Sequence, residues 1–530
     1  MTHYPAPRTR SASIRPIVII PNQYALFGQT GLVPPTRTWK TSRSTDVQPM
    51  AKPAVDAPEK DTEGFSLCPN TVKLPIGNAA KLRANLSAIE TLKLIRQQQR
   101  PATAAEKEIL TQYTGWGGLS GVWKAIEFEQ WQQNQLDPTA PLDESVSRWG
   151  SQYGRTRQRL TELLTAAEQT AAEASTLNAF FTSPDVVAAI WRAVDELGFT
   201  GGRILEPAAG IGYFIGMMPP SIRERSAWVA VEKDHLSGGI LQLLYPDVKT
   251  HVCGLEQTDL EAGSFDLVIG NVPFGGYTVY DRHHPELSSF AIHNYFIGRS
   301  AQLVKPGGIV ALVTSMGTLD ATGPEFRQFL TIEADTELVG AIRLPSNAFE
   351  ASSGTQVTTD VLFLRKRSGR VRTGAAHAFE RTVTLRAEAT DEDMVRTLAV
   401  NEYYHANPAM MLGEMRFADE VNKGGLYRAD QPTLYQPNPD QLPQLLAAAI
   451  DKLPKGVFDK TAVLTGKPTR AEQNAAQRFT DSVTIRGKRY SQTLIITQYE
   501  RVRKAFSQLR EAEKEGRGEA HTDDLRIELN

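Results

Sequence analysis

The sequence predicts an α/β protein built around a doubly wound, parallel sheet, and three observations support this class. Short apolar runs alternate with helical stretches from about residue 175 to residue 368, an order typical of parallel strands joined by helices. A turn of small residues that includes Gly210 and Gly212 follows the first run. A polar segment that begins at Asn271 follows another run, and open α/β sheets carry their ligand-binding groups at such strand ends.

Four stretches of different character follow one another along the chain. A chain of 530 residues is too long for a single core, so we expect two or three folded units. The predicted order is a disordered arm rich in Pro, Thr, Ser and Arg, a helical N-terminal region, the α/β domain and a mixed α+β C-terminal extension, over residues 1–75, 76–174, 175–368 and 369–530.

Hydrophobic periodicity places the individual elements. The helical region predicts helices over about residues 80–99 and 105–113, and the end of the extension predicts a charged helix over residues 499–515. Buried strands are predicted at residues 204–205, 228–231, 265–269, 308–313, 338–342 and 361–364.

Composition excludes several classes of protein. No apolar run is long enough to span a bilayer and no secretory segment is present, so we expect a soluble cytoplasmic protein. The two cysteines, Cys68 and Cys253, lie outside any Cys/His cluster, which argues against a disulfide framework or a zinc site. A net charge of −2 means that any nucleic-acid partner requires locally concentrated positive charge.

The turn after the first strand predicts a nucleoside site. Gly210 and Gly212 allow the backbone to turn tightly and to approach a ligand without a Cβ in the way. The chain has no glycine-rich phosphate loop here, so the turn does not predict a nucleotide triphosphate site. Glu232 ends the next strand, and an acid at that position accepts hydrogen bonds from both ribose hydroxyls. A plain turn with a surface acid is the alternative.

The segment after the strand at residues 265–269 has the chemistry of amine methylation. An amine conjugated to an aromatic ring is a poor nucleophile because its lone pair is delocalised. The Asn271 amide oxygen and the Val272 carbonyl are acceptors for its two hydrogens, and they free the lone pair. Pro273 keeps Val272 extended, and Phe274 offers a face on which a base stacks. Electrostatic positioning then supplies most of the catalysis.

With these motifs in this order, the sequence resembles the gamma-class adenine-N6 DNA methyltransferases. It is most similar to the methylase portion of phage- and plasmid-borne methylase–helicase fusions, in which Asn-Val-Pro-Phe-Gly replaces Asn-Pro-Pro-Tyr/Phe, as residues 271–275 do here. The resemblance runs from about residue 82 and is strongest over residues 178–367. It implies a Rossmann-like methyltransferase sheet, S-adenosylmethionine as cofactor, DNA as substrate and a helicase domain or subunit as partner.

The resemblance also implies roles for individual residues. The segment at residues 181–184 corresponds to the motif that holds the methionine carboxylate, residues 206–214 to the cofactor loop and residues 232–234 to the ribose acid. Residues 353–360 correspond to the motif that lines the target-base pocket. The cofactor-binding residues implied are Thr182, Pro184, Glu206, Pro207, Ala208, Gly210, Gly212, Phe214, Glu232, Lys233 and Glu256, and the catalytic ones are Asn271, Val272, Pro273 and Phe274.

Two departures from the family stand out. The motif that contacts the cofactor adenine usually begins with Asp and an aromatic residue, whereas here the acid is displaced to Glu256 and the aromatic is Leu255. The helicase portion of the fusions is absent, which leaves a truncated piece or a methylase that works with a separate helicase. The segment at residues 113–119 resembles one found ahead of the core in the fusions, and a packed turn explains it equally well.

The densest basic cluster is predicted to contact DNA phosphates. It consists of Arg365, Lys366, Arg367 and Arg370. Adjacent His283 and His284 lack partner ligands, and methyl transfer needs no metal, so no metal is expected.

Adenine methylation with base flipping, in a restriction-modification, anti-restriction or mobile-element system, is the leading hypothesis. Methylation of guanine N2 in RNA or of glutamine in protein, and a non-catalytic DNA-binding scaffold, are the alternatives.

Overall fold

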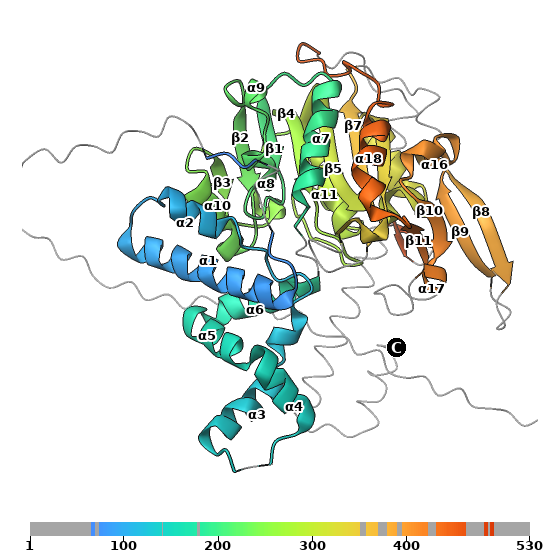
Figure 1. Ribbon diagram of the computed structural model, residues 1–530. Coiled ribbons are helices and arrows are strands. Elements are labelled where there is room, and N and C mark those ends of the chain that lie inside the picture. The colour runs from blue at the N-terminus through green and yellow to red at the C-terminus, as the bar shows by residue number, and fades with distance from the viewer. Residues whose placement is uncertain are drawn as a thin grey trace, which may run out of the picture. The chain divides into compact units, whose positions relative to one another are not determined.

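The described part of the chain centres on a sheet of seven strands. The computed structural model describes residues 65–68, 74–139, 141–177, 181–349, 357–368, 379–389, 395–421, 431–462, 482–485 and 488–491. The strands of the sheet are β1 (Arg203–Glu206), β2 (Ala227–Val231), β3 (Lys249–His251), β4 (Phe265–Asn271), β5 (Val304–Ser315), β6 (Thr336–Leu344) and β7 (Thr359–Lys366). Their order is β3-β2-β1-β4-β5-β7-β6 (Figure 1).

The direction of the strands sets the position of the site. The pairs β2–β3, β1–β2, β1–β4 and β4–β5 are parallel, whereas β7 runs antiparallel to β5 and β6. The parallel strands therefore end at one edge, called the carboxyl edge below. The predicted α/β class and its doubly wound sheet are confirmed, as are the six predicted strands. Prediction missed β3, because its three residues, Lys-Thr-His, carry no apolar signal.

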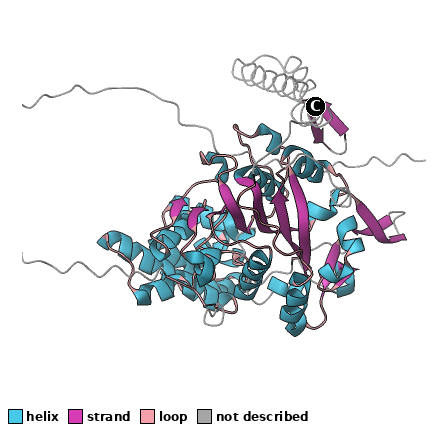
Figure 2. Ribbon diagram, turned by 90° about the horizontal axis from the view of Figure 1, so that it is seen from above, coloured by secondary structure: helices cyan, strands magenta, loops and turns pink. Residues whose placement is uncertain are grey.

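Helices pack on both sides of the sheet (Figure 2). The helices that follow the sheet strands or precede β1 are α7 (Pro184–Glu196), α8 (Tyr213–Gly216), α9 (Pro220–Arg223), α10 (His235–Leu244), α11 (Ile292–Leu303), α12 (Gly317–Asp320) and α13 (Glu325–Gln328). Helix α7 shows why they form. Pro184 occupies its first turn, where no intrahelical donor is lost, and one face buries Val187, Ile190 and Trp191 against the core.

Six helices precede this domain and cluster together in Figure 1 (blue to teal). They are α1 (Asn78–Gln98), α2 (Ala104–Leu110), α3 (Ala125–Leu136), α4 (Glu144–Trp149), α5 (Arg155–Leu163) and α6 (Ala166–Ala174). Capping boxes begin α2 at Thr103 and α6 at Thr165, each with a Glu three residues later. Both α1 and α2 pack against α10, so the helical region contacts the sheet domain beside β2.

The chain beyond β7 adds several small elements. These are the hairpin β8 (Thr382–Ala389) and β9 (Val395–Asn401), then α16 (Glu402–Ala406), β10 (Glu414–Phe417), α17 (Ala418–Val421), β11 (Pro432–Tyr435) and α18 (Leu442–Ile450), followed by the isolated pair β12 (Ser482–Ile485) and β13 (Lys488–Ser491). The helix predicted at residues 499–515 and most of the predicted arm lie outside the described residues. Among the described helices, none has the length and apolar character that a membrane crossing requires.

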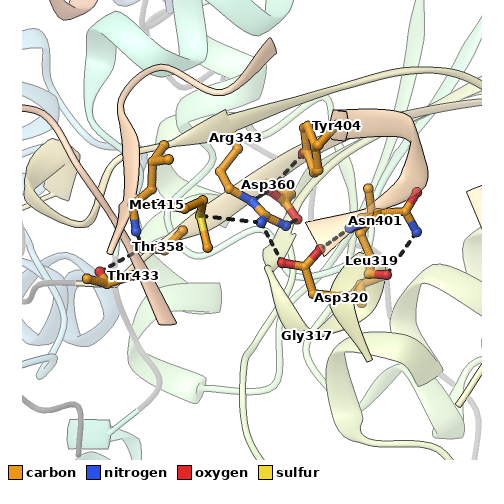
Figure 3. A network of polar contacts seen from close by, with 12 residues as sticks. Gly317, Leu319, Asp320, Arg343, Thr358, Asp360, Asn401, Tyr404, Met415 and Thr433 are labelled. Carbon is orange, nitrogen blue, oxygen red and sulfur yellow. Dashed lines mark hydrogen bonds and ion pairs between the residues drawn. The ribbon is translucent and has the colours of Figure 1, made fainter. Parts of the chain in front are cut away.

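A buried ion network joins these elements to the sheet (Figure 3). Arg343 of β6 is fully buried, and its Nε and Nη2 donate to the two carboxylate oxygens of Asp360 of β7 at 2.7 and 2.8 Å. Its Nη1 donates to Asp320 of α12. The Tyr404 hydroxyl donates to Asp360 at 2.8 Å, and the Asn401 amide N–H donates to Asp320 at 2.8 Å. The hairpin and α16 are thereby fixed to the sheet.

Candidate active site

The carboxyl edge brings three predicted polar residues together. Glu206 ends β1, Glu232 follows β2 and Asn271 ends β4. Strand β1 lies between β2 and β4, so the three strand ends are neighbours. A Cβ atom on Gly270, which has a φ of +153°, would lie 3.3 Å from Cγ of Glu206. The residue before Asn271 therefore packs directly against the Glu206 side chain.

Burial shifts the pKa of both acids at this edge. Burial, followed by the charge of Glu232, raises the pKa of Glu206 well above its ordinary value. Glu206 Oε2 is buried and has no hydrogen-bond partner among the described residues. Burial, followed by the charge of Asp234, raises the pKa of Glu232 to about 7. A buried acceptor in need of a donor is what a ligand hydroxyl or amine satisfies.

The turn after β1 is shaped around Glu232. The Gly210 N–H donates to Glu232 Oε2 at 2.7 Å, and the Asp234 N–H donates to Oε1 at 2.7 Å. Gly210 has a φ of +54°, and a Cβ there would lie 2.6 Å from Cε1 of Phe181. Gly212, with a φ of +85°, precedes α8. The glycines are thus required by backbone conformation and by close packing.

Some of the other predicted cofactor residues lie near the carboxyl edge, and the rest lie in the core, at the surface or in a turn after β3. Thr182 and Pro207 are buried at the same edge, Ala208 is half-buried and Pro184 begins α7. Phe214 points into the core, where its carbonyl accepts a hydrogen bond from the Trp191 indole at 3.0 Å, and Lys233 is exposed. Glu256 is half-buried in a turn after β3, close enough to Cys253 that its charge helps to raise the pKa of the Cys253 thiol, after burial.

The tetrapeptide leaves the sheet at the middle of the edge. Asn271 is aligned with Val313 of β5, and the Val272 N–H donates to the Val313 carbonyl at 3.1 Å. This hydrogen bond fixes the peptide group between Asn271 and Val272 against β5. The Val272 side chain is buried, whereas Phe274 is only partly buried against the core. Pro273 lies between them and is half-buried.

The structure places three residues of the predicted basic cluster against partners within the protein. Arg365 lies opposite Ile309, whereas Thr359 at the other end of β7 lies opposite Ser315. Because β7 is antiparallel, the cluster lies at the sheet edge remote from Asn271. Arg365 pairs with Glu337, Lys366 Nζ donates to the Ala301 and Ala334 carbonyls, and the buried Arg367 guanidinium donates to the Thr331 carbonyl. Arg370 lies outside the described residues.

The late motif at residues 353–360 is described only from residue 357 onward. Its Asp360 is fully buried and accepts hydrogen bonds from Arg343 and Tyr404 (Figure 3). The Thr358 hydroxyl accepts the Leu434 N–H at 2.9 Å. These contacts tie the start of β7 to β11. Thr359 also lies at the carboxyl edge, and its hydroxyl is buried without a hydrogen-bond partner among the described residues.

One neighbour of the cofactor loop was not predicted as a site residue. Tyr113 lies just after α2, is fully buried and makes an edge-on contact with Phe181, with ring centroids 6.4 Å apart. Burial raises the pKa of Tyr113, and the nearby charges of Asp234 and Glu232 raise it further. The turn at residues 113–119 therefore packs beside the ribose acid. Its cluster of glycines was the signal in the sequence, although such a cluster does not reveal its neighbour.

A family model matches the part of the chain that contains the tetrapeptide. Residues 234–348 match the model of the Eco57I restriction-modification methylase. This segment resembles a restriction-modification methylase. It contains Asn271 and the strands β3 to β6, and it confirms the resemblance predicted from the sequence. Together with the sheet topology it supports a methyltransferase that uses S-adenosylmethionine.

The chain is also similar in part to a curated protein and to solved structures. The chain is 30% identical over 190 residues to the "Defense against restriction protein B" of Escherichia phage P1, a match that covers 35% of this chain and 8% of the phage protein. A type I restriction-modification methyltransferase subunit from Streptococcus thermophilus is 13% identical, with a TM-score of 0.32 over 69% of this chain and 86% of that one. A TehB-like S-adenosylmethionine-dependent methyltransferase from Corynebacterium glutamicum is 14% identical, with a TM-score of 0.24 over 34% of this chain and 88% of that one.

Proposed function

We propose that this chain methylates the N6 amine of adenine in DNA, with S-adenosylmethionine as methyl donor and the target base flipped out of the duplex. One observation carries the proposal. The segment Asn271–Phe274 leaves β4 at the carboxyl edge, and the preceding Gly270 packs against the buried Glu206 of the cofactor turn. An amine-binding segment and a nucleoside cradle are therefore adjacent.

The residues of the cradle fit the cofactor. The glycine turn supplies space for a nucleoside, Glu232 supplies the acceptor for ribose hydroxyls, and Glu206 supplies a buried acceptor that lacks a donor. Thr182 is buried at the same edge, where it is proposed to hold the carboxylate end. When bound, S-adenosylmethionine supplies a methyl group on a sulfonium centre. The protein contributes position and charge.

The tetrapeptide performs the activation of the amine. The Asn271 amide oxygen and the Val272 carbonyl accept the two hydrogens of the amine, which localises its lone pair. The hydrogen bond from the Val272 N–H to the Val313 carbonyl fixes the backbone that carries both acceptors. Phe274 is partly exposed and stacks on the base. The surplus proton leaves after transfer, so no general base is required before it, and preorganised acceptors supply most of the catalysis.

A substitution of Asn271 tests the proposal. Asn271→Ala removes the first acceptor and is expected to lower methyl transfer by about 100-fold or more, the range found when a single preorganised hydrogen-bonding group is removed. Affinity for S-adenosylhomocysteine, measured by calorimetry, is expected to stay within about threefold. Long-read modification sequencing of DNA from cells that express each variant reports the modified base and its sequence context. Unchanged adenine methylation in the Asn271→Ala strain would refute the proposal.

Two wider aspects are part of the proposal. The partner is proposed to be a helicase domain or subunit, and the setting a restriction-modification, anti-restriction or mobile-element system, in keeping with the family match and the phage relative. Guanine N2 in RNA and glutamine in protein remain the alternative acceptors. Incubation of the protein with labelled S-adenosylmethionine and DNA, RNA or protein separates the three. Label that appears only in RNA or protein would exclude DNA as the substrate.

A further inference from the structure

The loop that follows the catalytic tetrapeptide exposes two aromatic side chains. Tyr277 is 49% exposed and Tyr280 is 81% exposed. Among the described residues, they are the two aromatic members of the set of exposed large hydrophobic side chains. Both lie within nine residues of Asn271, on the loop at residues 275–291 between β4 and α11. Exposed aromatic rings at such a position offer stacking faces to a substrate bound at Asn271.

This loop is built on an internal scaffold. Asp281, 1% exposed, accepts the Tyr295 hydroxyl of α11 at 2.7 Å and the His283 and His284 amide N–H groups at 2.8 and 3.1 Å. Its own N–H donates to Ser288 Oγ at 2.9 Å. The Asp281 carboxylate therefore connects the centre of the loop to α11 through Tyr295. It also closes the turn that follows it through the two histidine N–H groups.

The start of the loop is also fixed. The Tyr277 carbonyl accepts the Ile292 N–H at 2.8 Å, and Thr278 forms an antiparallel bridge with Ala291. A Cβ on Gly275 would lie 2.5 Å from Cε1 of Tyr277, so the Tyr277 ring packs against the backbone just after Phe274. Tyr280 stands between Val279, which packs on the core, and the buried Asp281. The scaffold thus presents Tyr280 to solvent from a fixed base.

The charge of the loop is suited to a polyanion. Arg282 and His283 are exposed beside Tyr280, and the Arg282 Nε donates to His283 Nε2 at 2.9 Å. The acids of the loop are turned inward, because Asp281 is buried and Glu286 is half-buried beside His284 and Gln302. Tyr280 is therefore followed closely in the sequence by the exposed cation of Arg282, and an aromatic ring near a cation is the combination that nucleic-acid surfaces use for stacking and phosphate contact.

We propose that Tyr280 is a DNA-opening residue, which inserts its ring into the base stack beside the target adenine while Arg282 contacts the flanking phosphate. The proposal rests on the proposed function, because it assumes that the substrate is duplex DNA whose target base is flipped towards Asn271. Extraction of a base costs unpairing and unstacking, and an inserted apolar or aromatic side chain restores part of the lost stacking. Tyr277, packed beside Phe274, borders the path of the flipped base.

Three variants separate insertion from other roles. Tyr280→Ala removes the ring, Tyr280→Phe retains the stacking surface without the hydroxyl, and Leu136→Ala on α3 is a control at a side chain that is 88% exposed. The target sequence comes from modification sequencing of cells that express the unchanged protein. Duplexes with that sequence are then made with a paired or a mispaired target adenine, and binding is measured in the presence of S-adenosylhomocysteine. Calorimetry with the same cofactor product verifies that each variant is folded.

The expected pattern is specific to insertion. Tyr280→Ala should weaken binding to the paired duplex about 10-fold or more, the scale of one lost base–aromatic stack, and Tyr280→Phe and Leu136→Ala should bind like the unchanged protein. On the mispaired duplex, Tyr280→Ala should weaken binding by only about threefold or less, since the base is already easier to extract. An equal defect on both duplexes, or no defect, would overturn the proposal. If the unchanged protein methylates no DNA, the proposed function is refuted, and this inference, which rests on it, is refuted as well.

Discussion

At the scale of single residues, Glu232 should make the stability of the protein and its cofactor affinity depend on pH in opposite directions. Its pKa is about 7 in the folded protein, against an ordinary value of 4.5, because burial disfavours the charge. Between these values the folded state retains a proton that the unfolded state has lost. The free energy of unfolding therefore falls as pH rises from about 4.5 to 7, by roughly 3 kcal/mol from this group.

Cofactor affinity should show the reverse trend. Ribose hydroxyls donate to the carboxylate, so affinity for S-adenosylhomocysteine is expected to rise as pH increases through about 7 and to level off above it. Calorimetric titrations and urea unfolding between pH 5.5 and 8.5 measure both trends. Glu232→Gln removes the titrating group, and it should flatten both curves relative to the unchanged protein. Equal pH slopes in the two proteins would show that another group controls binding.

Gly210 allows backbone strain to be separated from crowding. It has a φ of +54°, and a Cβ there would lie 2.6 Å from Phe181, whereas Gly263 has a φ of +63° and nothing within 4 Å of its Cβ position. Gly263→Ala should cost about 1–2 kcal/mol of stability through left-handed strain alone. Gly210→Ala should cost more, because the added methyl group also crowds Phe181. The resulting shift of the backbone N–H that binds Glu232 should weaken cofactor affinity about tenfold or more. Similar thermal shifts and affinities for both variants would contradict this distinction.

Residue identity was predictable at this scale where the chemistry is local. Asn271, Glu206, Glu232 and the glycines of the turn are coded by contiguous segments, and each segment follows a strand with a clear apolar signal. The environment of the basic cluster was not predictable in the same way. Its composition is evident from the sequence, but its distance from Asn271 depends on β7 being antiparallel. A short apolar run gives no indication of strand direction, so the sequence does not reveal at which edge of the sheet the cluster lies.

At the scale of elements, the ion network around Arg343 should carry much of the attachment between β6, β7 and α16. Arg343→Met would leave the buried carboxylates of Asp320 and Asp360 without their cation. We expect a loss of about 3–5 kcal/mol in the free energy of unfolding. Arg192→Met, which breaks an exposed pair with Asp451, should cost at most about 1 kcal/mol. Urea unfolding measures both variants.

A combined variant checks the physical reason. If the cost arises from uncompensated buried charge, Arg343→Met with Asp320→Asn and Asp360→Asn should be more stable than Arg343→Met alone. If the triple variant is less stable than the single one, the network acts through its hydrogen-bond geometry instead. The network also explains a limit of sequence prediction. Residues 320, 343, 360 and 401 lie far apart in the chain, and no local pattern links an arginine to acids at such distances.

At the scale of the whole molecule, the segment that ends at residue 462 returns to the methyltransferase sheet. Helix α18 packs on α7, the Phe458 N–H donates to the Leu197 carbonyl at 2.9 Å, and the Asp459 N–H donates to the Gly307 carbonyl at 3.1 Å. Leu446, Ile450 and Leu453 are buried in this packing. A boundary at residue 368 was predicted from composition, which does not register contacts between segments this far apart in the sequence.

These contacts predict different outcomes for two truncations. Removal of residues 369–530 exposes the surface that Leu446, Ile450 and Leu453 cover, at about 1.5–3 kcal/mol for each side chain, and it also strips Tyr404 from the Arg343 network. The sum is comparable with the whole net stability of a typical domain, about 5–15 kcal/mol. The shortened chain should therefore lose cooperative unfolding and binding of S-adenosylhomocysteine.

Removal of residues 463–530 is the matched control. In the described part of that segment, β12 and β13 pair only with each other, so the sheet keeps its described strand partners. This shorter deletion should bind S-adenosylhomocysteine within about threefold of the full chain, because Glu232 and the glycine turn keep their contacts. Circular dichroism melts and calorimetry compare the two truncations directly. Stable folding and full binding by residues 1–368 would show instead that the catalytic sheet is independent of the segment that covers it.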